Sequence, residues 1–261
     1  MRRVLALHCA LASGNAWRGV AWRIPDAELI RPDLPGHGGA PDWDETQDFQ
    51  TQALGLALDA AGEGPLDVVG HSFGATLALR LLVERPDMVR SLALVEPVMF
   101  AAADEAALTE YWICMAPFEE AMAEGRTEDA ARLFYREWGG EPGFGDLPEA
   151  ARASMARRIH LIAAQEPAIV ADVHGILPRL PAEGGPPTLI VTREAPPRIV
   201  AAIARGLSER MPGARIETLG RGHMIPTEAP EALAAMLREH WREGGDDEPR
   251  QPSGVSSRGP V

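Results

Sequence analysis

The sequence places Ser72 in the pentapeptide Gly-His-Ser-Phe-Gly at residues 70–74. The apolar run Leu66 to Val69 comes directly before it, and a helical pattern begins at Phe73. A sharp turn between a strand and a helix would hold the serine in a strained backbone conformation, with glycines that let neighbouring backbone pass closely. Its hydroxyl would stand at a helix N-terminus, where the dipole and free N–H groups favour developing negative charge. We therefore predict that Ser72 is a nucleophile.

A serine hydroxyl is a weak nucleophile at neutral pH and needs a base within hydrogen-bond reach, most often a histidine. His223 lies in Gly-Arg-Gly-His-Met-Ile-Pro at residues 220–226, just after the last apolar run. Because the carboxyl ends of parallel strands face one way, this loop shares an edge with Ser72. His71 adjoins the serine but should point to the other side of the turn. The remaining histidines are His8, His37, His160, His174 and His240. The sequence therefore predicts His223 as the base.

Short apolar runs alternate with helical patterns along the chain, which is typical of an α/β fold. We predict a mostly parallel sheet flanked by helices on both faces. The predicted strands are residues 4–7, 27–30, 66–69, 91–95, 188–191 and 216–219, and the predicted helices are residues 47–61, 73–84, 198–211 and 229–241. Apolar residues recur three and four positions apart in those helices, as amphipathic packing requires.

The alternation stops between about Pro97 and Pro186, where only helical patterns and Pro/Gly turns occur. We expect an α/β core in residues 1–97 and 187–243, a helical cap segment in residues 98–186, and a disordered tail in residues 244–261. The tail is too polar to offset the entropy of ordering. Eight of the fourteen aromatic residues fall between Phe100 and Phe144, so the cap segment has apolar surface to place. They either pack the cap on the core or line a substrate pocket.

Together these motifs resemble the α/β-hydrolase family over nearly all of residues 1–243. The resemblance rests on Leu-His-Cys-Ala at residues 7–10, Asp-Leu-Pro-Gly-His-Gly at residues 33–38, the Ser72 turn, and the Gly-His pair ending at His223. It implies that the backbone N–H groups of Phe73 and Ala10 form the oxyanion hole. It assigns no catalytic role to His37 or Asp33, which we interpret as turn residues.

The acid that would orient the histidine departs from the family pattern. Family members usually carry an aspartate after the penultimate strand, and that position falls on Pro196. Glu194 and Glu96 remain as candidates. The sequence favours Glu96, because it follows the strand next to the serine's own strand and so lies at the same edge of the sheet. It also follows two apolar residues, and half-burying a carboxylate there would cost free energy unless it had a partner. Glu194 adjoins Arg193, which could neutralise it in a surface pair.

The chemistry that these residues predict is hydrolysis of a small-to-medium carboxylic ester, a small-molecule substrate, through an acyl-enzyme. A serine nucleophile argues against dehalogenase and epoxide hydrolase chemistry, but lactones and carbon–carbon bonds stay open as substrates. A different class of function, a catalytically silent protein that binds a small molecule under its cap, also stays open. The missing aspartate is the feature that favours it.

The whole-chain composition limits the other possibilities. A formal net charge of −13 repels polyanions and argues against a nucleic-acid partner. Cys9 and Cys114 are far apart and give neither a disulfide framework nor a thiolate metal site, which fits a reducing cytoplasm. No apolar stretch is long enough to span a membrane. No motif indicates a cofactor or a metal, and the sequence does not indicate an oligomeric state.

Overall fold

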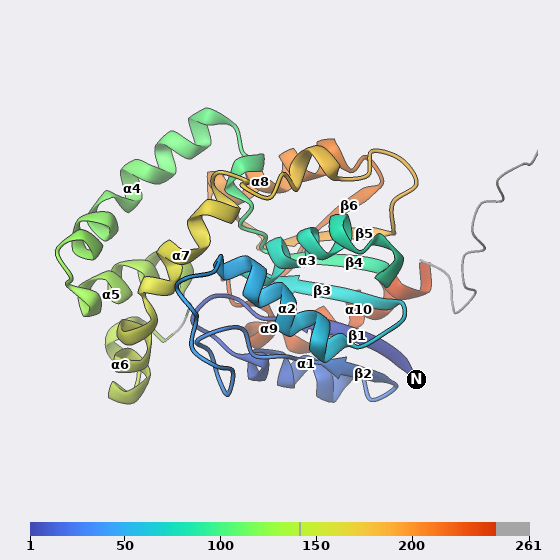
Figure 1. The fold of residues 1–261 in the computed structure, drawn as a ribbon, viewed down its shortest axis with the longest axis horizontal. Helices are drawn as coiled ribbons and strands as arrows, with labels where there is room; N and C mark the ends of the chain where they lie inside the picture. Colours follow the sequence, from blue (N-terminus) through green and yellow to red (C-terminus); the bar gives the residue numbers. More distant parts are fainter. Residues whose placement is uncertain (141, 244–261) are drawn as a thin grey trace, which may run out of the picture.

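The core of the structure is one parallel β-sheet (Figure 1). The computed structural model describes residues 1–140 and 142–243, and within them six strands pair in the order β2-β1-β3-β4-β5-β6. The strands are β1 (Arg2–Leu7), β2 (Ala27–Ile30), β3 (Leu66–His71), β4 (Val89–Val95), β5 (Thr188–Thr192) and β6 (Ala214–Thr218). All five pairings are parallel, which confirms the predicted sheet. Strand β6 begins two residues before its predicted start, because its pairing with β5 begins at Ala214.

Helices cover both faces of the sheet. One face packs against α2 (Phe49–Ala61), α3 (Phe73–Glu84) and α8 (Arg198–Arg210), and the other against α1 (Arg18–Arg23), α9 (Ile225–Glu228) and α10 (Pro230–Glu243). Successive strand residues point to opposite faces, so Leu5 joins the first core cluster and Val4 the second. The sheet is therefore buried on both sides, as the continuous apolar runs predict.

Between β4 and β5 the chain forms a helical insertion of α4 (Glu105–Ala123), α5 (Thr127–Trp138), α6 (Glu149–Arg158) and α7 (His160–Ile169). Figure 1 shows these helices beyond the carboxyl ends of the strands. Asp104 begins α4 by accepting a hydrogen bond from the Ala107 backbone N–H, a common helix cap. The insertion therefore lies over the edge of the sheet where the predicted catalytic residues end their strands.

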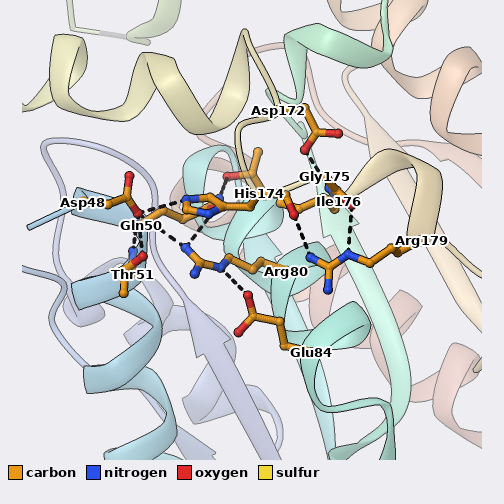
Figure 2. Close-up of polar contacts among 11 residues, drawn as sticks. Asp48, Gln50, Thr51, Arg80, Glu84, Asp172, His174, Gly175, Ile176 and Arg179 are labelled. Carbon is orange, nitrogen blue, oxygen red and sulfur yellow. Dashed lines mark hydrogen bonds and ion pairs between the residues drawn. The ribbon is translucent and has the colours of Figure 1, made fainter.

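A polar cluster attaches the end of this insertion to the core (Figure 2). After α7, His174 Nε2 lies 2.9 Å from Asp48 Oδ1, at the N-terminus of α2. Arg80 of α3 lies 3.4 Å from the same Asp48 oxygen and 2.7 Å from Glu84. Asp172 has a positive φ of 46° and accepts hydrogen bonds from the backbone of the next turn. The contact between His174 and Asp48 therefore ties this end of the insertion to α2, and Arg80 links the same aspartate to α3.

Two expectations concern the chain as a whole. Within residues 1–140 and 142–243, none of the helices combines the length and the apolar character needed to cross a membrane. The predicted disordered tail, residues 244–261, lies outside the described residues.

Candidate active site

Ser72 occupies a strained turn between β3 and α3. Its backbone φ of 56° and ψ of −118° lie outside the regions that L-residues normally adopt. A Cβ on Gly74 would lie 2.3 Å from the Leu7 carbonyl oxygen, and one on Gly70 would lie 2.2 Å from the Gly74 carbonyl oxygen. Only glycine fits at both positions. The Ser72 backbone N–H donates to the carbonyl of Val95 at 2.9 Å, so pairing with β4 continues through the turn.

Glu96 and His223 meet at the same edge of the sheet. Glu96 Oε2 lies 3.1 Å from His223 Nδ1, and both side chains are buried. Glu96 follows β4 with a φ of 47°, and its backbone N–H donates to the Val191 carbonyl at 2.7 Å. Ser72 and Glu96 therefore both have a positive φ at the ends of adjacent strands. Positive φ at two non-glycine residues in one site is local strain that the surrounding structure must offset.

Arg193 completes this cluster, although the sequence suggested that it could pair with Glu194 at the surface. Its backbone N–H donates to Glu96 Oε1 at 2.7 Å, and its guanidinium donates to Glu96 Oε2 at 2.9 Å from Nε and 2.7 Å from Nη2. Burial by itself would raise the pKa of the Glu96 carboxyl. The hydrogen bond from His223, together with the charge and hydrogen bonds of Arg193, outweighs burial and lowers that pKa below its usual range. Glu96 is therefore an ionised, fully paired carboxylate.

The contacts of His223 select one tautomer of its imidazole ring. A carboxylate can only accept, so the contact with Glu96 places a proton on Nδ1 and leaves the Nε2 lone pair free. Arg193 Nη2 also lies 3.4 Å from Nδ1, and a guanidinium can only donate. Donation from Arg193 would favour the opposite tautomer. The shorter contact to Glu96 favours the tautomer that a general base requires.

Two further contacts position the loop that carries His223. The Gly222 backbone N–H donates to Glu228 Oε2 at 3.0 Å, which ties the loop to α9. His71 Nε2 lies 2.8 Å from the His223 carbonyl oxygen, and the two rings are 4.9 Å apart. Burial lowers the pKa of His71 well below its usual value, so its ring is neutral and donates Nε2–H to that carbonyl. His71 thus contacts the backbone of His223.

The first loop, which carries Ala10, is fixed by neutral histidines. His8 donates from Nδ1 to the Cys9 carbonyl at 2.7 Å and accepts from the Leu34 backbone at 3.0 Å. His37 accepts from the Leu11 backbone N–H at 3.0 Å. Burial lowers the pKa of His8 to about 4 and that of His37 to about 3. Both rings therefore act as hydrogen-bonding parts of the loop.

A cavity beside Ser72 is lined mainly by apolar residues of the insertion. About 40 Å³ of it is wide enough for the centre of a water molecule, so it is narrow. The lining includes Ser72, Ala10, Phe100, Tyr111, Trp112, Phe118, Phe134 and Trp138. The Trp138 ring lies edge-on, 5.0 Å from that of His223. The aromatic residues pack on one another within the buried core cluster, and they also line this cavity.

The other acid candidate lies apart from this cluster. The Glu194 side chain is 62% exposed, and its carboxylate lies 4.0 Å from the exposed guanidinium of Arg221.

Phe73, predicted for the oxyanion hole, begins α3, so its backbone N–H is one of the helix's N-terminal donors without an intrahelical partner. Arg193 and His71 are the residues that sequence reasoning missed. An arginine directly after a buried strand was the available signal for Arg193.

The fold and this site define the class of α/β hydrolases. A family model described as the alpha/beta hydrolase family matches residues 4–236, and the chain belongs to that family. It is 32% identical over 256 residues to lipase LipV of Mycobacterium tuberculosis, which covers 90% of this chain and 92% of that protein. An alpha/beta hydrolase from Sphaerobacter thermophilus superposes with a TM-score of 0.68, at 25% identity over 92% of each chain. A haloalkane dehalogenase variant from Bradyrhizobium elkanii superposes with a TM-score of 0.70, at 22% identity over 93% of this chain and 89% of that one. That last likeness concerns the fold alone.

Proposed function

We propose that this protein is a serine hydrolase that cleaves small-to-medium carboxylic esters through an acyl-enzyme. The observation that carries the proposal is the 3.1 Å contact between Glu96 and His223, at the sheet edge where Ser72 ends the neighbouring strand. The similarity to lipase LipV supports an ester rather than another acyl derivative. A carbon–halogen bond is disfavoured as the substrate bond, because dehalogenation in this fold resembles attack by a carboxylate and the proposed nucleophile here is a serine.

The proposed mechanism begins with proton transfer from the Ser72 hydroxyl to His223 Nε2. The hydroxyl oxygen attacks the ester carbonyl, and the backbone N–H groups of Phe73 and Ala10 stabilise the oxyanion. His223 then gives its proton to the leaving alcohol. Water, activated by the same ring, hydrolyses the acyl-enzyme and restores Ser72. Glu96 keeps the proton on Nδ1 and stabilises the imidazolium that forms in each step.

In this proposal the cap segment, residues 98–186, holds the substrate over the sheet edge. The cavity that borders Ser72 is narrow, because about 40 Å³ of it admits the centre of a water molecule, against roughly 300–1,000 Å³ for typical small-molecule sites. Its apolar lining accommodates a hydrocarbon chain, and Trp138 brings the cap into contact with His223. Closure over the ester would exclude water from the oxyanion and strengthen the interactions that stabilise it.

A fluorophosphonate probe tests the nucleophile. An activated serine at a preorganised oxyanion site reacts with such a probe where ordinary serines do not. We expect covalent labelling of the wild type at Ser72, with hydrolysis of p-nitrophenyl esters, and loss of both in Ser72→Ala. Absence of labelling, or labelling that survives in Ser72→Ala, would show that the proposed function is wrong.

A further inference from the structure

The apolar cavity under the cap contains one buried amide. Gln165 of α7 is only 3% exposed and lines the same cavity as Ser72. Within the described ranges, its Nε2 atom is buried and has no hydrogen-bond partner. Leaving a buried amide unpaired is costly, so a group of this kind in an apolar cavity calls for a partner.

The residues around Gln165 offer few hydrogen-bond acceptors. The residues that surround the cavity are mainly hydrocarbon, including Met115, Ile162 and Ile169. The Tyr111 hydroxyl oxygen already accepts from the indole N–H of Trp138 at 3.3 Å. Within residues 1–140 and 142–243, the other acceptors of the lining, including the Glu119 and Glu166 carboxylates, do not bond to Gln165 Nε2.

Two acidic residues, Glu119 and Glu166, also line the cavity. Partial loss of contact with water raises the pKa of the largely exposed Glu119, and partial burial together with the charge of Glu119 raises the pKa of Glu166. Their negative charges would repel an anionic group on a substrate. Because Glu119 is exposed, this side of the cavity reaches the surface. The polar group that pairs with Gln165 is therefore a neutral one.

We propose that Gln165 is a specificity residue, and that the substrate carries a neutral hydrogen-bond acceptor, such as a keto, hydroxyl or amide oxygen, on the part of the ester that lies under the cap. The inference rests on the proposed function. It narrows the substrate class from plain alkyl esters to esters with an oxygen-bearing chain. The Gln165 amide donates to that oxygen, and the aromatic walls contact the hydrocarbon on either side of it.

Matched ester pairs test the assignment. In one series the keto group moves one carbon at a time along the acyl chain of a p-nitrophenyl ester. In a second series it moves along the alcohol chain of an acetate. Each keto ester is compared with the ester in which a terminal methylene replaces the keto oxygen, which keeps its shape. At one position in either series we expect kcat/KM of the wild type to favour the keto ester by about tenfold, the value of a good hydrogen bond.

Variants identify the residue responsible. Gln165→Leu should abolish the keto preference, and Gln165→Met, which is nearly isosteric, provides the same test if the leucine variant does not fold. The control is Gln47→Leu, at an exposed glutamine that does not line the cavity, and its preference should stay at the wild-type value. A wild type that favours the methylene ester at every position, or a preference that survives in the Gln165 variants, would overturn the inference. Failure of the proposed function would look different, because no ester would then show turnover that depends on Ser72.

Discussion

Two regions of this site treat buried polar groups in opposite ways. In the edge cluster, defined as Glu96, Arg193 and His223, each oxygen of the Glu96 carboxylate has a partner within 3.1 Å. In the cavity under the cap, Gln165 Nε2 has no such partner among the residues that the structure describes. A saturated cluster holds its members in a single arrangement, whereas an unsatisfied group is available to a ligand. The contrast separates the part that performs the proposed chemistry from the part that selects the substrate.

The largest expected effect comes from breaking the edge cluster at its acid. Glu96→Gln should lower kcat on an activated ester by about 10²- to 10⁴-fold, because the preferred tautomer of His223 is lost while Ser72 and His223 remain. Arg193 would then be the stronger neighbour of Nδ1, and its donation favours the wrong tautomer. Steady-state kinetics provides the measurement.

Glu194→Gln is the matched control for the acid. Glu194 is exposed, and within residues 1–140 and 142–243 its carboxylate forms an ion pair with the surface residue Arg221. Its kcat should stay close to that of the wild type. Near-normal kcat in Glu96→Gln would refute the assignment of Glu96, and collapse of the Glu194 variant alone would transfer the role to Glu194.

The next effect is on stability, through the arginine of the edge cluster. Arg193→Met leaves Glu96 buried with fewer compensating donors, and breaking a buried pair in this way costs about 3 kcal/mol. Arg193→Lys keeps the charge but not the planar fork, so it should recover only part of the loss. The free energy of unfolding in urea measures both.

Arg221→Met is the control for Arg193, because the guanidinium of Arg221 is exposed and its pair with Glu194 spans 4.0 Å. Exposed pairs of this kind contribute little, so its unfolding midpoint should match that of the wild type. Equal unfolding midpoints for Arg193→Met and Arg221→Met would mean that Arg193 does not support the cluster.

The smallest effect concerns the buried histidines of the first loop. His37 has a pKa lowered from 6.5 to about 3, first by burial and then by the charge of His8. On acidification below pH 6.5 the unfolded chain takes up a proton that folded His37 does not, so stability is lost as the pH falls from 6.5 toward 3. Each such histidine contributes a slope of up to about 1.4 kcal/mol per pH unit.

His37→Gln tests that slope. The variant should be less stable than the wild type at neutral pH, because the ring that accepts from Leu11 is lost. Between roughly pH 6 and pH 5, its free energy of unfolding should fall less steeply than that of the wild type. The difference in slope should be up to about 1.4 kcal/mol per pH unit, which corresponds to the uptake of one proton. Urea unfolding at several pH values gives both quantities. Parallel pH profiles for the two proteins would show that His37 is not held neutral by the fold.

The sequence by itself determined the parts of this protein that depend on local patterns. The alternation of apolar runs and helical periods predicted the parallel sheet, and the glycines around Ser72 predicted its strained turn, because both signals involve neighbours in the chain. The same reasoning placed His223 and Glu96 at one edge of the sheet, since parallel strands end on one side. It also predicted an inserted helical segment from the break in that alternation.

Only the tertiary structure decided which side chains meet across that edge. Arg193 adjoins Glu194 in sequence, yet a residue at the end of a strand can turn into the core, and Arg193 does so to pair with Glu96. The unpaired amide of Gln165 has no sequence signal, because a glutamine in a helix is ordinary until packing shows what surrounds it. Hydrogen bonds between side chains depend on distances of a few tenths of an ångström, and those are set by the packing of the whole chain.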